Sequence, residues 1–333
     1  MKKNRTILFF LFASVLFISC NKNKEVYYQD SGEIFHTYYN IKYKYSRLLT
    51  KEIQSELGRF DNSLNPFKKG SIISDVNDNV SVELDSLFIE VFIKSQEVSK
   101  VSDGLFDITC SPLINAWGFG FKNMDNITPQ IIDSLKDFVG YEKIRIVDGR
   151  IVKDDPRIQI NTSAIAKGFS VDIIARLFDS LGIENYMCEI GGEIAAKGLN
   201  PHGECWHIGV DKPLDEKKPD HRDLQTILSV CNKAVATSGN YRNFYLKDGK
   251  KYAHTIDPRT GYPSTGNILS VTVIAENCMT ADAYATTFML TSIDKALQIA
   301  NDQNLEIYII YTNEDGSTST VYSDEFKNYF AKR

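Results

Sequence analysis

The sequence predicts an α+β domain with a mixed β-sheet core and surrounding helices. Two Asp-Gly pairs between alternating runs indicate β-hairpins, and three apolar stripes at helical spacing indicate helices. Toward the C-terminus, two β-branched and aromatic runs enclose Ala-rich sequence that is typical of a helix. Helices and hairpins mixed in this way favour an α+β fold over a doubly wound parallel sheet.

Residues 1–19 are predicted to be a signal peptide of the lipoprotein type. Lys2, Lys3 and Arg5 precede an apolar run over residues 7–18. As a helix this run would rise only about 18 Å, against roughly 30 Å for a hydrocarbon layer, so a secretory signal fits better than a membrane span. The end of the run resembles a bacterial lipobox, and we expect cleavage before Cys20 and acylation of its thiol. The alternative is an uncleaved anchor, which leaves the compartment unchanged.

Residues 20–31 are expected to form the lipid anchor and a polar tether, and residues 32–330 one large domain, located in the cell envelope and facing the periplasm or the outside. Without the three cations of the signal, 35 Lys+Arg face 43 Asp+Glu, a net charge of −8. No basic stripe is present, so nucleic acid is not an expected partner. Five cysteines remain after Cys20, with no CxxC pair. This argues against a disulfide scaffold and a zinc site, and we expect mostly buried, apolar thiols.

Three helices are predicted from the apolar stripes. The first contains residues 48–57 and is expected to stop at Gly58, and the second contains residues 84–98. The third begins near residue 164, and Gly182 stands where its C-terminal cap should be.

Two hairpins are predicted at the Asp-Gly pairs. Residues 144–147 and 150–153 flank the first pair, and residues 244–247 and 250–254 flank the second. A short strand over residues 157–160 is expected before the third helix. The C-terminal part then adds, in order, a strand at 269–275, a helix at 280–290, a helix from 292 and a strand at 305–311.

The start of the third helix is a candidate phosphate site. Residues 161–168 read Asn-Thr-Ser-Ala-Ile-Ala-Lys-Gly, and Lys167 would add a full charge to the unpaired N–H groups of a helix start. The structural alternative is that Asn161 or Ser163 only caps the helix while Lys167 is solvated. Neither a P-loop nor a Rossmann glycine motif occurs in the sequence.

Two further segments carry candidate chemistry. Asp282 and Thr286 lie one helical turn apart and offer hard oxygen ligands of the kind that Mg²⁺ takes. The structural alternative is that Asp282 lies near a helix start and interacts with the helix dipole, while Thr286 packs in the interior. His254 and Asp257 stand beside a Pro/Gly turn, either as acid–base groups or as turn chemistry with Asp257 capping it. Ser238 lies in a small-residue stretch where a ligand could approach closely.

Seven motifs in order resemble one family, the FAD:protein FMN transferases (ApbE, or flavin transferases). They lie at residues 102–109, 112–120, 164–168, 191–193, 236–241, 254–263 and 281–283. The resemblance covers roughly residues 32–311, and it implies a two-lobed domain of the ApbE type. It also implies FAD as substrate and Mg²⁺ as cofactor.

The resemblance implies a set of site residues. The metal would be held by the carbonyl of Ala164 together with Asp282 and Thr286. FAD would contact residues that share positions with the family's motifs: Phe67, Leu105, Phe106, Asp107, Asn161, Lys167, Ser238 and Ile256. Three positions depart from the family pattern: Phe67 replaces Tyr, Asn161 replaces Asp, and Phe35-His36-Thr37 replaces Met-Gly-Thr.

The implied reaction is displacement at the FMN phosphorus of FAD, with AMP leaving. The attacking oxygen would be a Ser or Thr hydroxyl on an exported acceptor protein, such as a flavinylated redox subunit. The lipid anchor would attach the enzyme to the membrane. We expect His254 to be the catalytic base, with Asp257 as second choice. The alternatives are an FAD pyrophosphatase, in which water attacks, and a non-catalytic flavin-binding lipoprotein.

Overall fold

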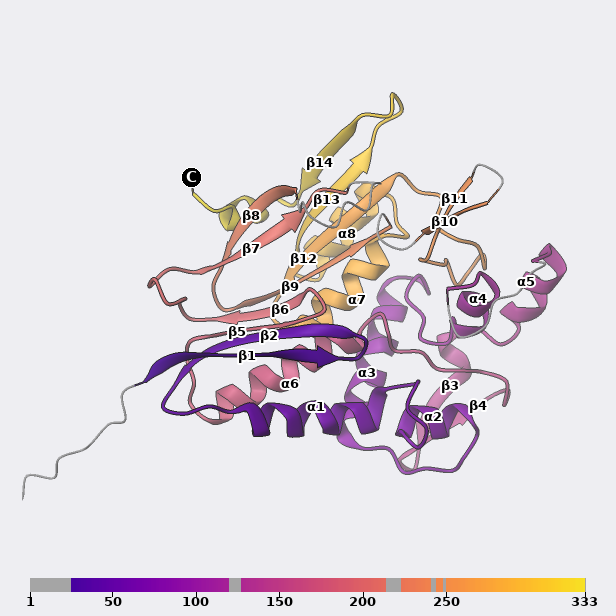
Figure 1. Cartoon of the computed structure of the whole chain (residues 1–333). Helices are drawn as coiled ribbons and strands as arrows, with labels where there is room; N and C mark the ends of the chain where they lie inside the picture. The colour runs from indigo at the N-terminus through magenta and orange to yellow at the C-terminus, as the bar shows by residue number, and fades with distance from the viewer. Residues whose placement is uncertain (1–24, 120–126, 214–222, 241–243, 248–249, 333) are drawn as a thin grey trace, which may run out of the picture.

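The computed structural model describes residues 25–119, 127–213, 223–240, 244–247 and 250–332. Its centre is an eight-stranded sheet with the strand order β1-β2-β5-β6-β9-β12-β13-β14 (Figure 1). Every pairing in this sheet is antiparallel. The predicted α+β class is confirmed, with an antiparallel sheet where a mixed one was expected.

The strands of the central sheet are β1 (Val26–Ile34), β2 (Thr37–Tyr45), β5 (Tyr186–Ile190), β6 (Glu193–Lys197), β9 (Lys233–Gly239), β12 (Ile268–Ala275), β13 (Glu306–Thr312) and β14 (Thr318–Tyr322). Three separate hairpins are formed by β3 (Ile144–Val147) with β4 (Arg150–Lys153), β7 (Trp206–Asp211) with β8 (Leu224–Val230), and β10 (Phe244–Lys247) with β11 (Lys250–Ala253). The helices are α1 (Thr50–Leu64), α2 (Ile72–Asn77), α3 (Ser86–Val101), α4 (Ser111–Ala116), α5 (Pro129–Lys136), α6 (Ala166–Ser180), α7 (Cys278–Phe288) and α8 (Ile293–Asp302), with 3-10 turns η1 (Tyr141–Lys143) and η2 (Asp324–Tyr329).

The two faces of the central sheet are covered by different elements. Helices α1, α3, α6, α7 and α8 pack on one face, where two large apolar clusters lie. The hairpin β7–β8 and η2 pack on the opposite face and bury a third cluster. Neighbouring residues of one strand serve both faces: Ile309 contacts the helices, and Ile310 contacts the hairpin side. This follows from the alternation of side chains along a strand.

Most predicted elements are confirmed. The strands on both sides of each Asp-Gly pair form the predicted antiparallel pairs, β3–β4 and β10–β11, while Asp248 and Gly249 themselves lie outside the described residues. The C-terminal series appears as β12, α7, α8 and β13, and the third helix appears as α6, followed by Gly182 with φ +72°. None of the described helices is long and apolar enough to cross a bilayer. The predicted signal peptide and Cys20 lie outside the described residues.

The predicted stop at Gly58 is wrong. Helix α1 continues through Gly58 to Leu64, and the residues that follow the glycine include the buried Phe60 and Leu64. An interior glycine costs a helix about 0.5–1 kcal/mol relative to alanine. Burial of two further large side chains is worth more than that, so tertiary packing overrides the local signal.

The predicted strand over residues 157–160 does not form. The side-chain amide of Asn77 donates to the carbonyl of Ile160 at 2.8 Å and accepts from its N–H at 2.7 Å. One side chain therefore satisfies both backbone groups that a neighbouring strand would otherwise bond.

The expected tether is shorter than residues 20–31. Residues from Val26 onward belong to β1, which pairs along its whole length with β2. The buried carboxylate of Asp30 accepts a hydrogen bond from the hydroxyl of Tyr43 at 2.7 Å. Polar sequence here marks a half-exposed edge strand, which alternates sides like any other strand.

One disulfide is present, although the cysteine pattern predicted mostly buried, apolar thiols and argued against a disulfide scaffold. Cys205 and Cys231 are bonded, with Cα atoms 5.1 Å apart. Cys205 precedes β7 and Cys231 follows β8, and the pair Trp206↔Val230 brings the two ends of this hairpin opposite each other. The spacing of 26 residues carries no local signal for such a bond. The other three described cysteines are free and buried, as predicted.

Helices α6 and α7 approach each other at Gly168. A Cβ atom at this position would lie 2.3 Å from the carbonyl oxygen of Cys278 and 2.7 Å from the Cβ of Asp282. The start of α7 is also bound to α6 one turn further on, because the Asp172 carboxylate accepts the N–H groups of Cys278 and Met279 at 2.7 and 2.8 Å. Only glycine fits at this contact.

We expect Gly168→Ala to lower the free energy of unfolding by about 1–3 kcal/mol or to prevent folding, because the new methyl group meets backbone that cannot move aside. Gly58→Ala is the matched control, since an added Cβ there contacts nothing within 4 Å. This control should stabilise the protein by about 0.5–1 kcal/mol. Chemical denaturation of the two variants measures both effects, and equal stabilities would contradict the close approach of α6 and α7.

Candidate active site

Two predicted metal ligands, Asp282 and Thr286, lie one turn apart on α7. The Asp282 side chain is almost fully buried, and its Oδ2 accepts the backbone N–H of Gly168 at 2.9 Å. The Thr286 hydroxyl lies 3.4 Å from the hydroxyl of Ser238, near the end of β9. The polar face of α7 is thus turned toward the start of α6 and the end of β9.

Ala164, the third predicted ligand, lies just before α6. In an α-helix the N–H of Gly168 would bond the carbonyl four residues earlier, which is that of Ala164. Here this N–H donates to Asp282 instead, and within the described ranges no hydrogen bond to the Ala164 carbonyl is present. A backbone carbonyl beside a carboxylate is therefore available to a ligand.

Lys167 and Glu193 add charges to the same place. The Lys167 ammonium donates to Oε1 of Glu193 at 2.5 Å, and Glu193 is the first residue of β6. Burial raises the pKa of Glu193 to about 7, with Asp282 adding to the shift, and burial raises the pKa of Asp282 as well. Burial opposes the charge of Lys167, but the two carboxylates raise its pKa. Two buried carboxylates therefore share one ammonium.

This donor set fits Mg²⁺. A carboxylate, a hydroxyl and a carbonyl are hard oxygen donors, and the excess negative charge favours a divalent cation. Among the described residues there is no group of three or more His, Cys, Asp or Glu that could hold a metal alone. Phosphate oxygens and water would have to complete the coordination, as is common for Mg²⁺.

Glu193 was not assigned a role by the sequence, although it ends a Gly-Gly-Glu motif. Gly191 and Gly192 have φ values of +65° and +102° and form the turn between β5 and β6. This turn delivers Glu193 to Lys167. Two glycines before a buried acid are a visible signal, but its partner 26 residues earlier is not.

Asn161 and the predicted contacts at residues 105–107 lie near the same helix start. The N–H of Asn161 donates to the carbonyl of Ile108 at 2.7 Å, and its side chain accepts from Ser163 at 2.9 Å in a local turn. It does not cap α6, whose first residues have no side-chain cap. Leu105, Phe106 and Ile256 are buried in this structure.

Asp107 lies at the edge of a pocket of about 630 Å³, which is also lined by Tyr141, Pro258 and Arg259. Its carboxylate accepts the N–H and the hydroxyl of Thr109 and the N–H of Tyr141, at 2.6–2.8 Å. Burial is the larger effect and raises the pKa of Asp107 to about 6. The pocket joins the motif at residues 102–109 to the one at 254–263.

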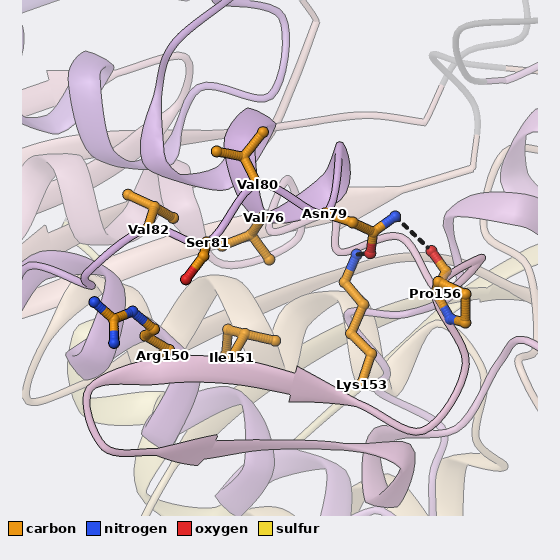
Figure 2. Close-up of a pocket in the computed structure, with 9 residues that line it drawn as sticks. All are labelled: Val76, Asn79, Val80, Ser81, Val82, Arg150, Ile151, Lys153 and Pro156. Carbon is orange, nitrogen blue, oxygen red and sulfur yellow. Dashed lines mark hydrogen bonds between the residues drawn. The ribbon is translucent and has the colours of Figure 1, made fainter.

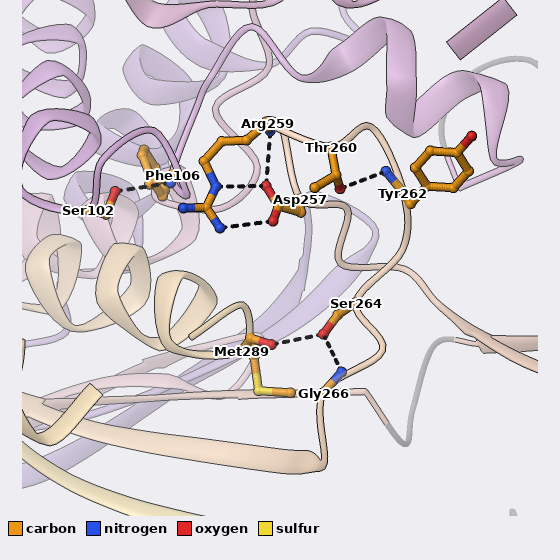
Figure 3. Close-up of polar contacts among 9 residues, drawn as sticks. All are labelled: Ser102, Phe106, Asp257, Arg259, Thr260, Tyr262, Ser264, Gly266 and Met289. Carbon is orange, nitrogen blue, oxygen red and sulfur yellow. Dashed lines mark hydrogen bonds and ion pairs between the residues drawn. The ribbon is translucent and has the colours of Figure 1, made fainter. Parts of the chain in front are cut away.

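Asp257 is engaged in a local ion pair. Its carboxylate accepts the backbone N–H of Arg259 at 2.9 Å and two guanidinium nitrogens at 3.1 and 3.0 Å (Figure 3). Its own N–H donates to the carbonyl of Tyr262 and closes the turn. This arrangement is the turn chemistry left open above, and it weighs against Asp257 as a proton acceptor.

His254 lies just before this turn. Its ring contacts the ring of Phe119 edge to face, with centroids 6.3 Å apart. The next residue, Thr255, donates to the side chain of Asn240 at 2.9 Å, and Asn240 follows the strand end that carries Ser238. The structure therefore links His254 to the end of β9, where Ser238 meets Thr286.

Phe67 is 62% exposed, and its ring meets that of His36 edge to face with centroids 6.0 Å apart. A flat, open aromatic face is suited to stacking on a ring system. His36 and Phe35 form the tip of the β1–β2 hairpin with left-handed backbone, at φ +58° and +50°.

A second pocket, of about 260 Å³, lies between the segment after α2 and the β3–β4 hairpin (Figure 2). Arg150 and Lys153 line it together with valines, and Lys153 donates to Asn79 at 3.1 Å. None of the predicted site residues lines this pocket.

Comparison with known proteins gives one consistent result. A family model described as the ApbE family matches residues 35–309. An FAD:protein FMN transferase of Vibrio cholerae is 34% identical over 98% of this chain and 100% of the relative, and one of Haemophilus influenzae is 34% identical over 93% of each. The solved structure of the flavin transferase ApbE from Vibrio cholerae has a TM-score of 0.82 at 33% identity, covering 92% of this chain and 99% of that one. The Pseudomonas stutzeri flavinyl transferase ApbE, apo form, has a TM-score of 0.82 at 26% identity, covering 93% and 98%.

The pKa of Asp107 predicts a pH effect on stability. Its value of about 6 lies above the ordinary 3.8, so between these values the folded protein binds more protons than the unfolded chain. This contribution to the free energy of unfolding is complete below the ordinary value and is lost as the pH rises to about 6, and its full size is about 3 kcal/mol. Unfolding titrations from pH 4 to 7 should show a smaller decline for Asp107→Asn than for the natural protein. The exposed Asp103→Asn is the control, and equal declines for all three proteins would refute the assignment.

Proposed function

Since the chain belongs to the ApbE family, we propose that it transfers FMN from FAD to a Ser or Thr hydroxyl of an exported acceptor protein in an Mg²⁺-dependent reaction. The protein is a transferase, and FMN transfer from FAD to protein is the activity by which its relatives are named. One observation supports the magnesium dependence above all. Asp282, Thr286 and the Ala164 carbonyl come from two helix regions and present oxygen donors next to Lys167.

The reaction moves one phosphoryl linkage. The acceptor hydroxyl oxygen forms a bond to the FMN phosphorus, the bond from that phosphorus to the bridging oxygen breaks, and AMP leaves with the electron pair. Mg²⁺, when bound, offsets the negative charge of the pyrophosphate. Lys167 at the start of α6 supplies a further positive charge, and the helix start supplies N–H groups.

The hydroxyl proton must be accepted during the attack, and we assign this role to His254. Asp257, the second choice, is bound to the Arg259 guanidinium. A carboxylate held in two charge-assisted hydrogen bonds is a weaker proton acceptor than an imidazole. His254 carries the imidazole of this motif and is linked through Thr255 to the end of β9.

The proposed function includes a location outside the cytoplasm. We infer a cell-envelope protein, anchored through an acylated Cys20 and facing the periplasm or the outside. The disulfide between Cys205 and Cys231 supports an oxidising compartment, because such bonds rarely persist in a reducing cytosol. The acceptor would then be an exported flavinylated redox subunit.

Incubation with FAD, Mg²⁺ and an acceptor protein should give AMP and covalently flavinylated acceptor. Asp282→Asn should lower the rate at least about 100-fold, because the charge stabilisation that depends on the metal is lost. The asparagine keeps an oxygen for the Gly168 N–H, so its fold should remain. Thr286→Val tests the hydroxyl in the same way.

Three outcomes separate the candidate functions. AMP with labelled acceptor is the result expected for the transferase. AMP with free FMN at an equal rate, whether or not acceptor is present, would replace it by a pyrophosphatase. Binding of FAD with no AMP would replace it by a flavin carrier.

His254→Ala should reduce FMN transfer by about 10²–10⁴-fold, the usual loss when a general base is removed. The KM for FAD should change little, because the base acts on the acceptor proton. Asp257→Asn serves as the control and should retain most of the activity. Full activity of His254→Ala at saturating Mg²⁺ would show that the base lies elsewhere.

A further inference from the structure

Glu193 lies in an unusual environment. Its carboxylate is buried, with one oxygen on Lys167 and the other, Oε2, without a hydrogen-bond partner in the part of the chain that the structure describes. A Cβ at Gly191 would lie 3.3 Å from this Oε2, so a side chain at that position would crowd the carboxylate. An acid that is buried at this cost and paired through one oxygen calls for a functional explanation.

Lys167 has two carboxylates within its reach. Its ammonium is bound to Glu193, and the neighbouring Gly168 N–H is bound to Asp282. The lysine stem is long and flexible, and the side chain is 40% exposed, so the ammonium has space to reorient. Both carboxylates act electrostatically on this one ammonium.

The two possible pairings have different consequences for a cation. When Lys167 is paired with Glu193, Asp282 gives Oδ2 to Gly168, and its Oδ1 accepts no hydrogen bond from the described residues. If Lys167 paired with Asp282 instead, the ammonium would take the position of a metal ion and neutralise its only carboxylate ligand. A buried carboxylate without a partner is strongly unfavourable, so this pairing would form once Glu193 was unable to compete.

We propose that Glu193 is a positioning residue that holds the Lys167 ammonium away from Asp282 and so keeps Asp282 available to a divalent cation. This role rests on the proposed function, in which Asp282 is a metal ligand. The lysine remains at the site, charged and close to where the phosphates would lie. Glu193 therefore allows Asp282, the proposed metal ligand, and the positively charged Lys167 to lie close together.

The test measures binding of Mn²⁺ alone, followed by the electron paramagnetic resonance signal of the free ion, on the mature protein without FAD. Glu193→Asp keeps the charge but is one methylene shorter, so it should release Lys167 and raise the Kd for Mn²⁺ at least about tenfold. The double variant Glu193→Gln/Lys167→Met has the same net charge as the natural cluster and no ammonium. It should bind Mn²⁺ about as tightly as the natural protein.

Glu189→Gln, on the neighbouring strand β5, is the matched control and should leave the Kd unchanged. Unchanged binding by Glu193→Asp would show that only the net charge matters, and weak binding by the double variant would show that Lys167 is not the competitor. Either result overturns the role of Glu193, as does a natural protein that binds no Mn²⁺. Thermal melts identify a variant that fails to fold, and the double variant then provides the comparison.

A different result would contradict the proposed function without contradicting the role of Glu193. A natural protein that binds Mn²⁺ and shows the expected order of affinities, but releases no AMP from FAD, would retain the role of Glu193 and lose the transferase reaction.

Discussion

The hydrogen bond from the Gly168 N–H to the buried Asp282 carboxylate determines most of the site. It joins α6 to α7 at a point where only a glycine allows the two helices to meet. It takes the N–H that would otherwise occupy the Ala164 carbonyl, and it fixes one oxygen of Asp282. The same contact places Lys167 near Asp282, because Lys167 directly precedes Gly168 on α6. Packing and ligand geometry are thus set by one backbone donor.

The electrostatics of the site follow from this packing. Burial raises the pKa of both Glu193 and Asp282, so ionising the two together is unfavourable, and the Lys167 ammonium opposes this effect only in part. Such an arrangement is costly for stability, since buried ions lose their hydration. Binding of the proposed divalent cation together with the anionic substrate would offset this cost. The electrostatic cost of the buried carboxylates would therefore be smaller in the ligand-bound state than in the empty site.

The sequence predicted those features whose cause is local. The two Asp-Gly hairpins, the helix end at Gly182 and the spacing of Asp282 and Thr286 depend on residues within a few positions of each other. The stop at Gly58 and the strand at residues 157–160 failed because distant partners decided them: the core beneath Phe60, and the amide of Asn77. The Cys205–Cys231 bond and the Lys167–Glu193 pair were missed for the same reason. Much of the candidate site was identified through resemblance to a family, since the spacing of Lys167 or Asp282 alone fits a solvated or capping residue equally well.

The bond between Gly168 and Asp282 spans 114 residues of chain. During synthesis or translocation, the half of the site on α6 emerges first and stays without its carboxylate until α7 has followed. Closing so long a segment is entropically costly, and the hydrophobic contacts of α7 with the sheet must compensate for it. A partly made chain therefore lacks the complete set of oxygen donors proposed to hold the metal. If the site binds the proposed ion, it can do so only after α7 has packed against α6.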